Sequence, residues 1–170
     1  MKKKVILYIA TSLDGFIARK NGSVDWLPEI NNSEEDYGYN EFFDSVGIVI
    51  LGNTIYKQVK APYENKKCFV FSRKNTGKED NIIYVNSDVK DFIDGLSDEG
   101  NIWLVGGADI VKEFLKNNLI DEFIITVIPT LLGEGIPLFG VGCGEHQLKL
   151  LDTKSYDSGV VQLHYLLQSL

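Results

Sequence analysis

The sequence contains few of the residues that build disulfide frameworks and metal sites. Among 170 residues there are two cysteines, Cys68 and Cys143, and two histidines, His146 and His164. The cysteine spacing fits neither a disulfide framework nor a zinc site. Both histidines come late in the chain, and no nucleophile is arranged with them in a recognisable pattern. Hydrolytic triads and zinc chemistry are therefore poorly supported.

The sequence also lacks an excess of positive charge and a long apolar run. Its formal net charge of −7 argues against a nucleic-acid surface, where Lys and Arg cluster. No apolar run is long enough to span a bilayer. Three lysines precede the first apolar run as in a signal peptide, but Thr11, Ser12 and Asp14 end that run early. We expect a cytoplasmic protein with one domain over residues 1–170.

Short apolar runs alternate with helical patterns over most of the chain. Buried strands are predicted at residues 5–10, 48–51, 68–71, 82–85 and 102–105. Helices are predicted at residues 33–45, 89–96 and 110–115, with a short one through Lys57 and Val59. A β-rich run follows at residues 122–130, and residues 148–150 and 160–167 suggest a closing antiparallel pair. This order indicates an α/β fold with a mostly parallel central sheet and an antiparallel C-terminal edge. In the last strand, polar Gln162 and His164 alternate with apolar residues, so one face is expected to be wetter.

Residues 102–115 read as a strand that turns through Gly106 and Gly107 into a helix. Such a turn offers free N–H groups and the positive end of the helix dipole. Without a Cβ, a glycine lets a phosphate approach the backbone. The stretch is either an anion site or a plain Gly–Gly connection, and the pair of glycines alone does not decide between them.

Small or polar residues follow four of the predicted parallel strands. They occupy residues 10–12, 52–54, 72–74 and 106–107. The carboxyl ends of parallel strands meet at one edge of an open sheet, where ligands bind. Their convergence favours a ligand that bears phosphates. Arg73 and Lys74 either bind such a phosphate or the adenine, or form a solvated basic loop.

Carboxylates are the remaining candidates for acid–base chemistry. Asp36 and Glu35 come about one turn before Tyr39, near the edge of the apolar face of a predicted helix. Ser33 and Asp36 also fit a capping box, in which Asp36 would stabilise the start of that helix. The two roles do not exclude each other.

Four motifs, in this order, resemble the RibD C-terminal, dihydrofolate-reductase-like family. They are SLDGFIA at residues 12–18, VILGNTIY at 49–56, VGG at 105–107 and PTLLGEGIPLF at 129–139. The resemblance extends over nearly the whole chain. It implies a dihydrofolate-reductase-like three-layer fold with helices on both faces of the sheet. It also implies NADPH as cofactor, hydride transfer to a small heterocyclic or carbonyl substrate, and often a homodimer.

The resemblance also assigns roles to particular residues. Those that would hold the dinucleotide are Gly52, Asn53, Thr54, Ser72, Arg73, Val105, Gly106, Gly107, Ala108, Asp109 and Ile110. Ala10 and Ile17 would flank the nicotinamide. The substrate side would be lined by Trp26, Tyr37, Tyr39 and Thr126. The proton donor would be Asp36, with Glu35 as its rival, and an apolar pocket should raise the pKa of that carboxyl. A cis peptide bond is implied between Gly106 and Gly107.

Two departures from the family pattern bear on specificity. Asn53 stands where the family often has arginine, so contact with the adenosine 2′-phosphate would fall to Arg73 and Lys74. Lys66 stands where dihydrofolate reductases have an arginine for the folate tail, which disfavours folate as substrate.

The zinc signature of the deaminase half of the bifunctional riboflavin enzyme is absent from the sequence. The resemblance therefore favours a reductase step like that on 5-amino-6-(5-phosphoribosylamino)uracil. Dihydrofolate reduction and a non-catalytic dinucleotide-binding module are the alternatives.

Overall fold

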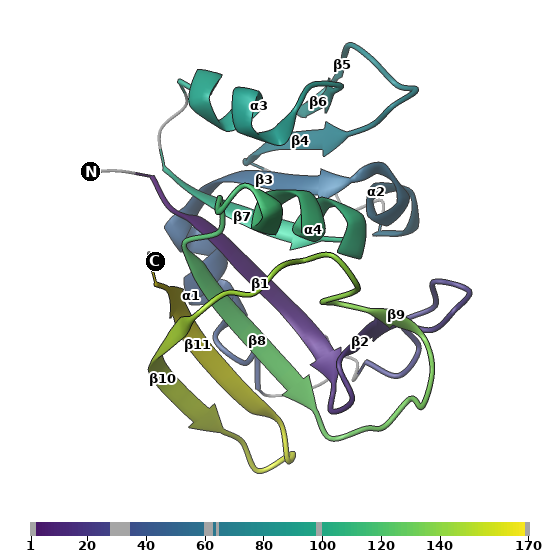
Figure 1. Ribbon diagram of the computed structural model, residues 1–170, viewed down its shortest axis with the longest axis vertical. Helices are drawn as coiled ribbons and strands as arrows, with labels where there is room; N and C mark the ends of the chain where they lie inside the picture. Colours follow the sequence, from purple (N-terminus) through teal and green to yellow (C-terminus); the bar gives the residue numbers. More distant parts are fainter. Residues whose placement is uncertain (1–2, 28–34, 60–62, 64, 98–99, 169–170) are drawn as a thin grey trace.

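Nine of the described strands form one sheet with helices on both faces (Figure 1). The computed structural model describes residues 3–27, 35–59, 63, 65–97 and 100–168. The main sheet contains β1 (Val5–Ser12), β3 (Val46–Gly52), β4 (Lys67–Phe71), β5 (Lys78–Glu79), β6 (Ile82–Val85), β7 (Asn101–Gly106), β8 (Glu122–Ile128), β10 (Leu148–Ser155) and β11 (Val161–Leu167). A second sheet pairs β2 (Phe16–Ala18) with β9 (Ile136–Pro137). The helices are α1 (Tyr39–Ser45), α2 (Asn53–Val59), α3 (Val89–Gly95) and α4 (Ala108–Lys116).

The order of the strands in the main sheet confirms the predicted fold class. That order is β10-β11-β8-β1-β7-β3-β4-β6-β5. The strands from β8 to β6 in this order run parallel to one another. Antiparallel strands complete both edges, with β11 and β10 on one side and β5 on the other. The sheet is thus mostly parallel with an antiparallel C-terminal edge, as predicted.

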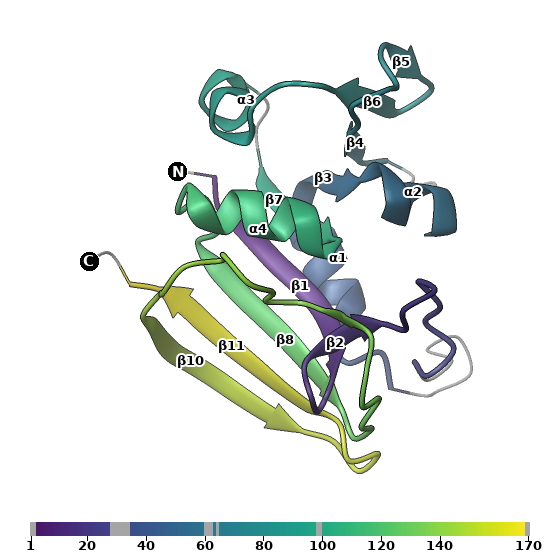
Figure 2. The ribbon, with the colours of Figure 1, turned by 45° about the vertical axis from the view of Figure 1, so that its right-hand side comes forward.

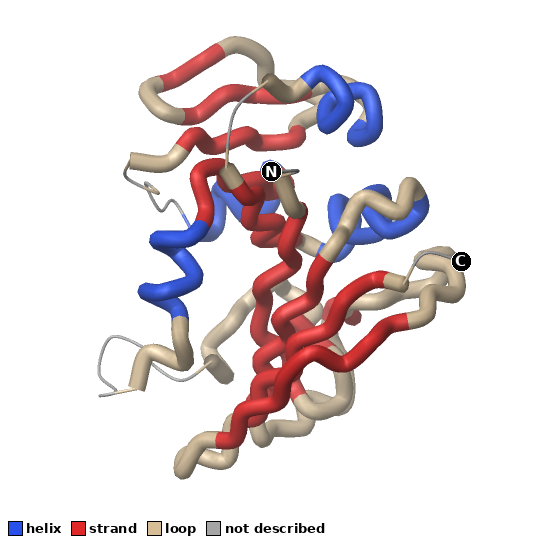
Figure 3. The backbone as a smooth tube through the Cα atoms, turned by 90° about the vertical axis from the view of Figure 1, so that its left-hand side faces the viewer, coloured by secondary structure: helices blue, strands red, loops and turns tan. Residues whose placement is uncertain are grey.

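Alternating side chains of the strands pack into two apolar layers, one on each face of the sheet. Val5 and Leu7 of β1 share one layer with Phe114 of α4. Ile6, between them, belongs to the opposite layer with Phe42 of α1. Figure 3 shows α1 on one side of the sheet and α3 and α4 on the other. Burial on both faces explains why the parallel strands have continuous apolar sequences.

The helix predicted at residues 33–45 is shorter in the structure. Ser33 lies outside the described residues, and α1 begins only at Tyr39. Tyr37 and Gly38 have φ angles of 53° and 77°. These values are in the left-handed region, so neither residue can extend the right-handed helix toward the N-terminus. The apolar spacing predicted that a helix exists but not where it begins.

Three short strands and most of β10 were not predicted. β2 has three residues and β5 and β9 have two each, which is too few for alternation to reveal. β10 continues beyond the predicted residues 148–150 because the polar segment up to Ser155 pairs with β11. All eight residues of β10 are exposed, as expected of an edge strand.

Candidate functional site

The carboxyl ends of four neighbouring parallel strands bring the predicted cofactor residues together. β1, β7, β3 and β4 are consecutive in the sheet. Gly106 and Gly52 end β7 and β3, Ser72 follows β4, and Ala10 lies in the last part of β1, shortly before the end of that strand. Ile17 is buried in β2, which lies beside the end of β1 in Figure 2. The predicted convergence at one edge is therefore confirmed, whereas the binding roles stay predictions.

Gly52 and the Gly106–Gly107 pair form the closest part of this edge. A Cβ on Gly52 would lie 3.8 Å from both Gly106 O and Gly107 N. The peptide bond between Gly106 and Gly107 is cis, as predicted. Gly107 is the N-cap of α4, so Ala108, Asp109 and Ile110 form its first turn. Their N–H groups have no acceptor within the helix and point out of the N-terminus of α4.

Asn53 adds an unpaired acceptor to this edge. Its buried Oδ1 has no hydrogen-bond partner among the residues that the structure describes. A carbonyl oxygen can accept from a hydroxyl but cannot pair with a phosphate, which only accepts. The position of Asn53 therefore suits a ribose hydroxyl and agrees with the prediction that another residue must hold a 2′-phosphate. Thr54, the next residue, is exposed on α2.

The loop after β4 is held in shape by Ser72 and presents two basic side chains. Ser72 Oγ accepts hydrogen bonds from Lys74 N at 3.2 Å and Asn75 N at 2.9 Å, and Ser72 is buried. These bonds fix the loop and leave the side chains of Arg73 and Lys74 exposed. Ser72 thus shapes the loop, and Arg73 and Lys74 remain accessible to an anion.

The structure brings only some of the predicted substrate-side residues together. Tyr37 belongs to an apolar cluster that also includes Ala10 and Trp26. Thr126 lies opposite Ala10 in the register of β1 and β8. Tyr39 instead packs among the aromatic rings around Trp103, with ring centroids 5.8 Å apart. The indole Nε1 of Trp26 is buried and has no partner within the described chain, so a ligand acceptor would suit it.

The carboxyl of Asp36 does not have the raised pKa that was predicted for a general acid. Its Oδ1 accepts from Gly38 N at 2.9 Å and its Oδ2 from Asn40 N at 3.1 Å. These backbone hydrogen bonds hold the pKa of Asp36 below its usual range. Glu35, the rival, is exposed, and its Oε1 accepts from Tyr37 N at 3.1 Å. Both carboxylates therefore accept from backbone N–H groups around the start of α1, and Asp36 does so from a position before the N-cap Gly38. Ser33, its partner in the predicted capping box, lies outside the described residues.

Replacing Asp36 by alanine is expected to lower the stability of the protein and to change turnover by less than about twofold. A general acid would instead contribute roughly 10²-fold or more to turnover. Because its pKa is lowered, the ionised Asp36 carboxylate stabilises the fold above the usual Asp pKa of about 3.9, and this contribution is lost as pH falls below it. Denaturant unfolding at neutral and acidic pH, with turnover measured in parallel, checks both statements. Asp36→Asn, which preserves one acceptor oxygen, serves as the matched control.

The structure adds polar residues that the sequence pattern did not single out. On the face of β11 expected to be wetter, Gln162 is buried instead, with 9% exposure, whereas His164 remains partly exposed. Its Nε2 donates to Tyr37 O at 3.1 Å and to Thr126 Oγ1 at 3.0 Å. Tyr8 OH also donates to Tyr37 O, at 3.3 Å. Burial raises the pKa of Tyr8 to about 12, so its hydroxyl keeps its proton.

A cavity of about 220 Å³ lies beside this group, between α1 and the strands β8, β10 and β11. It is lined by Tyr8, Gly38, Glu41, Phe42, Ser45, Ile124, Asp152, Lys154, Gln162 and His164. Two lining residues, Tyr8 and Gln162, also bond to Tyr37 of the predicted substrate side. The cavity lies away from the glycines of the carboxyl edge, and the predicted cofactor residues do not line it.

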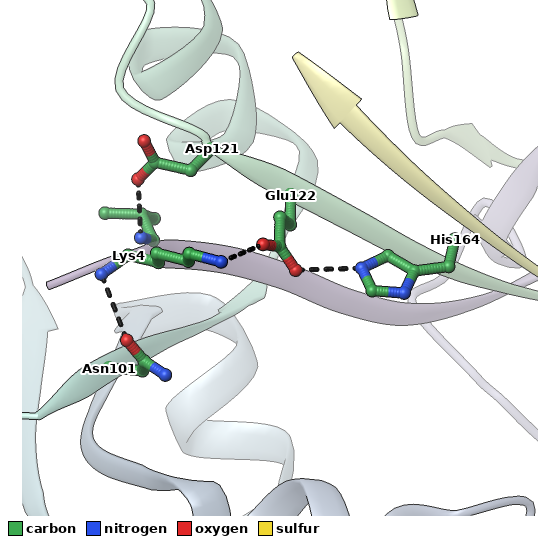
Figure 4. A network of polar contacts seen from close by, with 6 residues as sticks. Lys4, Asn101, Asp121, Glu122 and His164 are labelled. Atoms are coloured by element: carbon green, nitrogen blue, oxygen red, sulfur yellow. Dashed lines mark hydrogen bonds and ion pairs between the residues drawn. The ribbon is translucent and has the colours of Figure 1, made fainter. Parts of the chain in front are cut away.

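A second polar cluster lies at the opposite ends of the strands (Figure 4). Glu122, the first residue of β8, accepts from Lys4 Nζ at 2.6 Å through Oε1. Its Oε2 lies 2.8 Å from His164 Nε2. Val5 N donates to Asp121 Oδ2 at 2.8 Å, which ties β1 to the start of β8. The sequence pattern gave no sign of this cluster because its members are far apart in the chain.

Among the described residues, no group of three or more His, Cys, Asp or Glu side chains could hold a metal ion. No helix in the described part of the chain is long and apolar enough to cross a membrane.

The fold and its glycine-rich carboxyl edge define the chain as a reductase-like α/β domain, and comparison with known proteins identifies its family. Residues 3–162 match the RibD C-terminal domain. The chain therefore belongs to the RibD C-terminal domain family. It is also 44% identical to the uncharacterized protein YwjB of Bacillus subtilis (strain 168), over 97% of this chain and 98% of that protein.

Solved structures agree with this family. A candidate riboflavin biosynthesis protein from Shewanella sp. PV-4 matches with a TM-score of 0.83 and 30% identity, over 98% of this chain and 99% of that one. A deaminase/5-amino-6-(5-phosphoribosylamino)uracil reductase from Thermotoga maritima matches with a TM-score of 0.77. The latter is 15% identical and matches over 98% of this chain and 57% of its own, so it supports the fold alone.

Proposed function

We propose that the protein is an NADPH-dependent reductase that transfers hydride to a small heterocyclic or carbonyl substrate. The type of reaction is that on 5-amino-6-(5-phosphoribosylamino)uracil in riboflavin biosynthesis. The observation that carries this proposal is the contact of Gly52 with the Gly106–Gly107 turn at the start of α4. Two backbones without Cβ atoms at a helix N-terminus suit a pyrophosphate.

The residues at the carboxyl edge fit a dinucleotide. The first-turn N–H groups of α4 would bind the pyrophosphate, and Asn53 Oδ1 would accept from a ribose hydroxyl. Ala10 and Ile17 would lie against the nicotinamide, as the family pattern implies. NADPH, when bound, supplies the hydride. The chain itself binds and orients the cofactor and the substrate.

The source of the proton follows from the carboxylates at the turn. Hydride addition to a C=N or C=O bond leaves negative charge that must be protonated. Asp36 is ionised by its two backbone hydrogen bonds and holds no proton to give at neutral pH. We therefore assign the proton to water rather than to Asp36.

A binding titration followed by a turnover assay tests the proposal. Nicotinamide fluorescence should report NADPH binding, and loss of NADPH absorbance should then follow addition of 5-amino-6-(5-phosphoribosylamino)uracil. Binding with no turnover on this substrate or on dihydrofolate would favour the non-catalytic alternative. Absence of NADPH binding would rule out the proposed function altogether.

Folate is disfavoured as the substrate by the surroundings of Lys66. Its Nζ donates to Val46 O at 2.6 Å and lies 4.6 Å from the centre of the Phe43 ring. The ammonium is therefore engaged within the protein. Aromatic rings also fill the space around Trp103 on the α1 face, where Phe42 and Tyr63 lie 5.6 and 5.3 Å from it. We expect dihydrofolate to be turned over more slowly than the uracil substrate.

Replacing Arg73 by alanine is expected to weaken NADPH about tenfold and to leave NADH nearly unchanged. A hydrogen bond to a charged group contributes about 1.5–3 kcal/mol, and solvent screening at this exposed loop favours the lower end. Titrations of both cofactors against wild type and variant check this. Lys78→Ala, at an exposed basic residue of β5 beyond the same loop, is the control. If NADPH and NADH weaken equally, Arg73 stabilises the loop and does not select the phosphate.

We also propose that the protein is a homodimer, through the edge strand β10. Leu148 and Leu150 are 38% and 51% exposed, and nearby Phe139 is 50% exposed. Leu150 of β10 lies opposite Tyr165 of β11, which in turn lies opposite Phe123 of β8. The ring centroids of Phe123 and Phe139 are 6.4 Å apart. An exposed apolar strip along an unpaired strand edge is suited to association. Light scattering on wild type and Leu150→Lys tests this, and a monomeric wild type would refute it.

A further inference from the structure

One amide group, that of Gln162, joins two elements of the predicted substrate side. Its Nε2 donates to Thr126 Oγ1 at 3.0 Å and to the backbone oxygen of Tyr37 at 3.1 Å. A primary amide has two N–H hydrogens, so both are used. The residue is 9% exposed, which shields these bonds from water.

The strand register places Gln162 close to the proposed nicotinamide position. Gln162 lies opposite Thr126 in β11 and β8, and Thr126 lies opposite Ala10 in β8 and β1. Directly opposite residues of neighbouring strands point to the same face of the sheet. The three residues therefore form one row beneath the turn that precedes α1.

The carbonyl that Gln162 binds belongs to a residue in an uncommon conformation. Tyr37 has a φ of 53°, which is unfavourable for a residue with a Cβ. Gln162 and Tyr8 both donate to its carbonyl. Its ring packs edge-on against Tyr156 at 4.9 Å, and its hydroxyl donates to Ser158 Oγ at 3.2 Å. Contacts from the sheet and from the loop after β10 thus hold this turn in place.

The direction of the bond to Thr126 determines what its hydroxyl can do. An amide N–H only donates, so Thr126 Oγ1 is the acceptor in this pair. The single hydrogen of Thr126 then remains available to be donated to another group. A donor beside Ala10 suits a substrate that has an acceptor near the bond to be reduced.

We propose that Gln162 is a positioning residue for the reductase reaction. It keeps the Thr126 hydroxyl as a donor to the substrate and holds Tyr37 at the same site. This inference rests on the proposed function. It also narrows the substrate class to molecules with a carbonyl oxygen or ring nitrogen next to the carbon that receives hydride. A fixed donor there would stabilise the negative charge that develops on that atom.

Gln162→Glu is the sharpest test, because it preserves the shape of the side chain but removes both N–H donors. The carboxylate would also accept the hydrogen of Thr126 and so withdraw it from the substrate. With 5-amino-6-(5-phosphoribosylamino)uracil as probe, we expect kcat to fall about tenfold to hundredfold. The Kd for NADPH should change by less than about twofold, because Gln162 is not among the cofactor residues. Gln147→Glu makes the same change at an exposed position and is the control.

Gln162→Glu places a charge at a buried position, which is costly in itself. A double-mutant cycle therefore extends the test to uncharged variants. Gln162→Met and Thr126→Val should each lower kcat, and the double variant should lose no more than the worse single variant. Thr126→Ser, which retains the hydroxyl, should lower kcat less than Thr126→Val does. A purely structural role for Gln162 predicts instead that the two losses multiply.

The outcomes separate this inference from the proposed function. An active wild type whose kcat is unchanged by Gln162→Glu, or multiplying losses in the cycle, would overturn the positioning role alone. A wild type that binds NADPH but reduces neither the uracil probe nor dihydrofolate would overturn the proposed function, and the positioning role with it. A shared, non-multiplying loss in kcat with intact NADPH binding would support both.

Discussion

Replacing Gly52 by alanine is expected to weaken NADPH binding roughly tenfold to hundredfold while leaving the fold intact. A Cβ at this position would lie 3.8 Å from Gly106 O and Gly107 N and 3.9 Å from Ile110 Cγ2. These are ordinary van der Waals separations, so the protein alone has room for the methyl group. A dinucleotide that lies against this backbone would meet the added methyl. Overpacking of this kind costs about 1–3 kcal/mol, which corresponds to the expected change in Kd.

The control for Gly52→Ala is Gly95→Ala at the end of α3. A Cβ on Gly95 would meet nothing within 4 Å, and the residue is remote from the carboxyl edge. Gly95→Ala should stabilise the protein by up to about 1 kcal/mol without changing NADPH affinity. Nicotinamide fluorescence titrations and denaturant unfolding on both variants give the comparison. Unchanged NADPH affinity in Gly52→Ala would place the dinucleotide elsewhere.

The fold could be predicted from the sequence because its central strands are buried on both faces. Ile48, Val49 and Ile50 each have about 1% exposure or less, although they point alternately to the two layers. Such strands appear as continuous apolar runs, and the small residues after them mark one edge of the sheet. The placing of Gly52, Gly106 and Gly107 at one edge of the sheet follows from this local information. Their closeness to one another depends also on the pairing of β3 with β7, which the sequence pattern did not predict.

The role of Asp36 could not be predicted in the same way. Its place in the sequence suggested a carboxylate on a helix, near the apolar face. The left-handed conformations of Tyr37 and Gly38 put Asp36 outside α1 instead, where its oxygens accept backbone N–H groups. A carboxylate that accepts such bonds is stabilised in its charged form. The residue at which α1 begins therefore determines which groups surround the Asp36 carboxylate and whether it is ionised. Helix starts are the part of a helix that periodicity predicts least well.

Gln162 shows the limit of strand alternation. The pattern of β11 predicted one wetter face, but on that face Gln162 is buried by the turn before α1, where it bonds to Tyr37, 125 residues away in the chain. Polar residues buried by such distant segments look like surface residues in the sequence. Once buried, they must be hydrogen-bonded, and Gln162 is bonded to the residues of the candidate site.

Replacing Glu122 by glutamine is expected to lower the free energy of unfolding by about 1–3 kcal/mol. The side chain of Glu122 is 9% exposed and is bound by Lys4 and by His164 (Figure 4). Lys4 belongs to the segment before β1, and Glu122 begins β8, so the pair ties neighbouring strands at their amino ends. The side chain of Lys4 is 53% exposed, so its ammonium is solvated when Glu122 is replaced. The expected loss of unfolding free energy is therefore smaller than for a fully buried pair.

Glu113→Gln provides the matched control for Glu122→Gln. Glu113 pairs with Lys116 on the surface of α4 at 2.8 Å, and its side chain is 50% exposed. Surface pairs of this kind contribute about 0–1 kcal/mol. Denaturant unfolding of the two variants beside wild type gives the comparison. Equal losses in both variants would show that Glu122 acts as an ordinary surface charge.

The pH dependence of this difference tests whether the ionised form of Glu122 is responsible. Burial by itself raises the pKa of Glu122, but the hydrogen bonds from Lys4 and His164 outweigh burial and hold that pKa below its usual value. The folded state thus binds the proton less readily than the unfolded state. The contribution of Glu122 is therefore complete above the usual Glu pKa of about 4.3 and is lost as pH falls through the lower pKa of the folded state.

The stability difference between wild type and Glu122→Gln should be largest near neutral pH and should shrink below about pH 4. Asp14 and Asp36, whose pKa values are also lowered, contribute equally to both proteins and cancel. A difference that stays constant across this range would mean that Glu122 stabilises the protein through packing rather than through its charge.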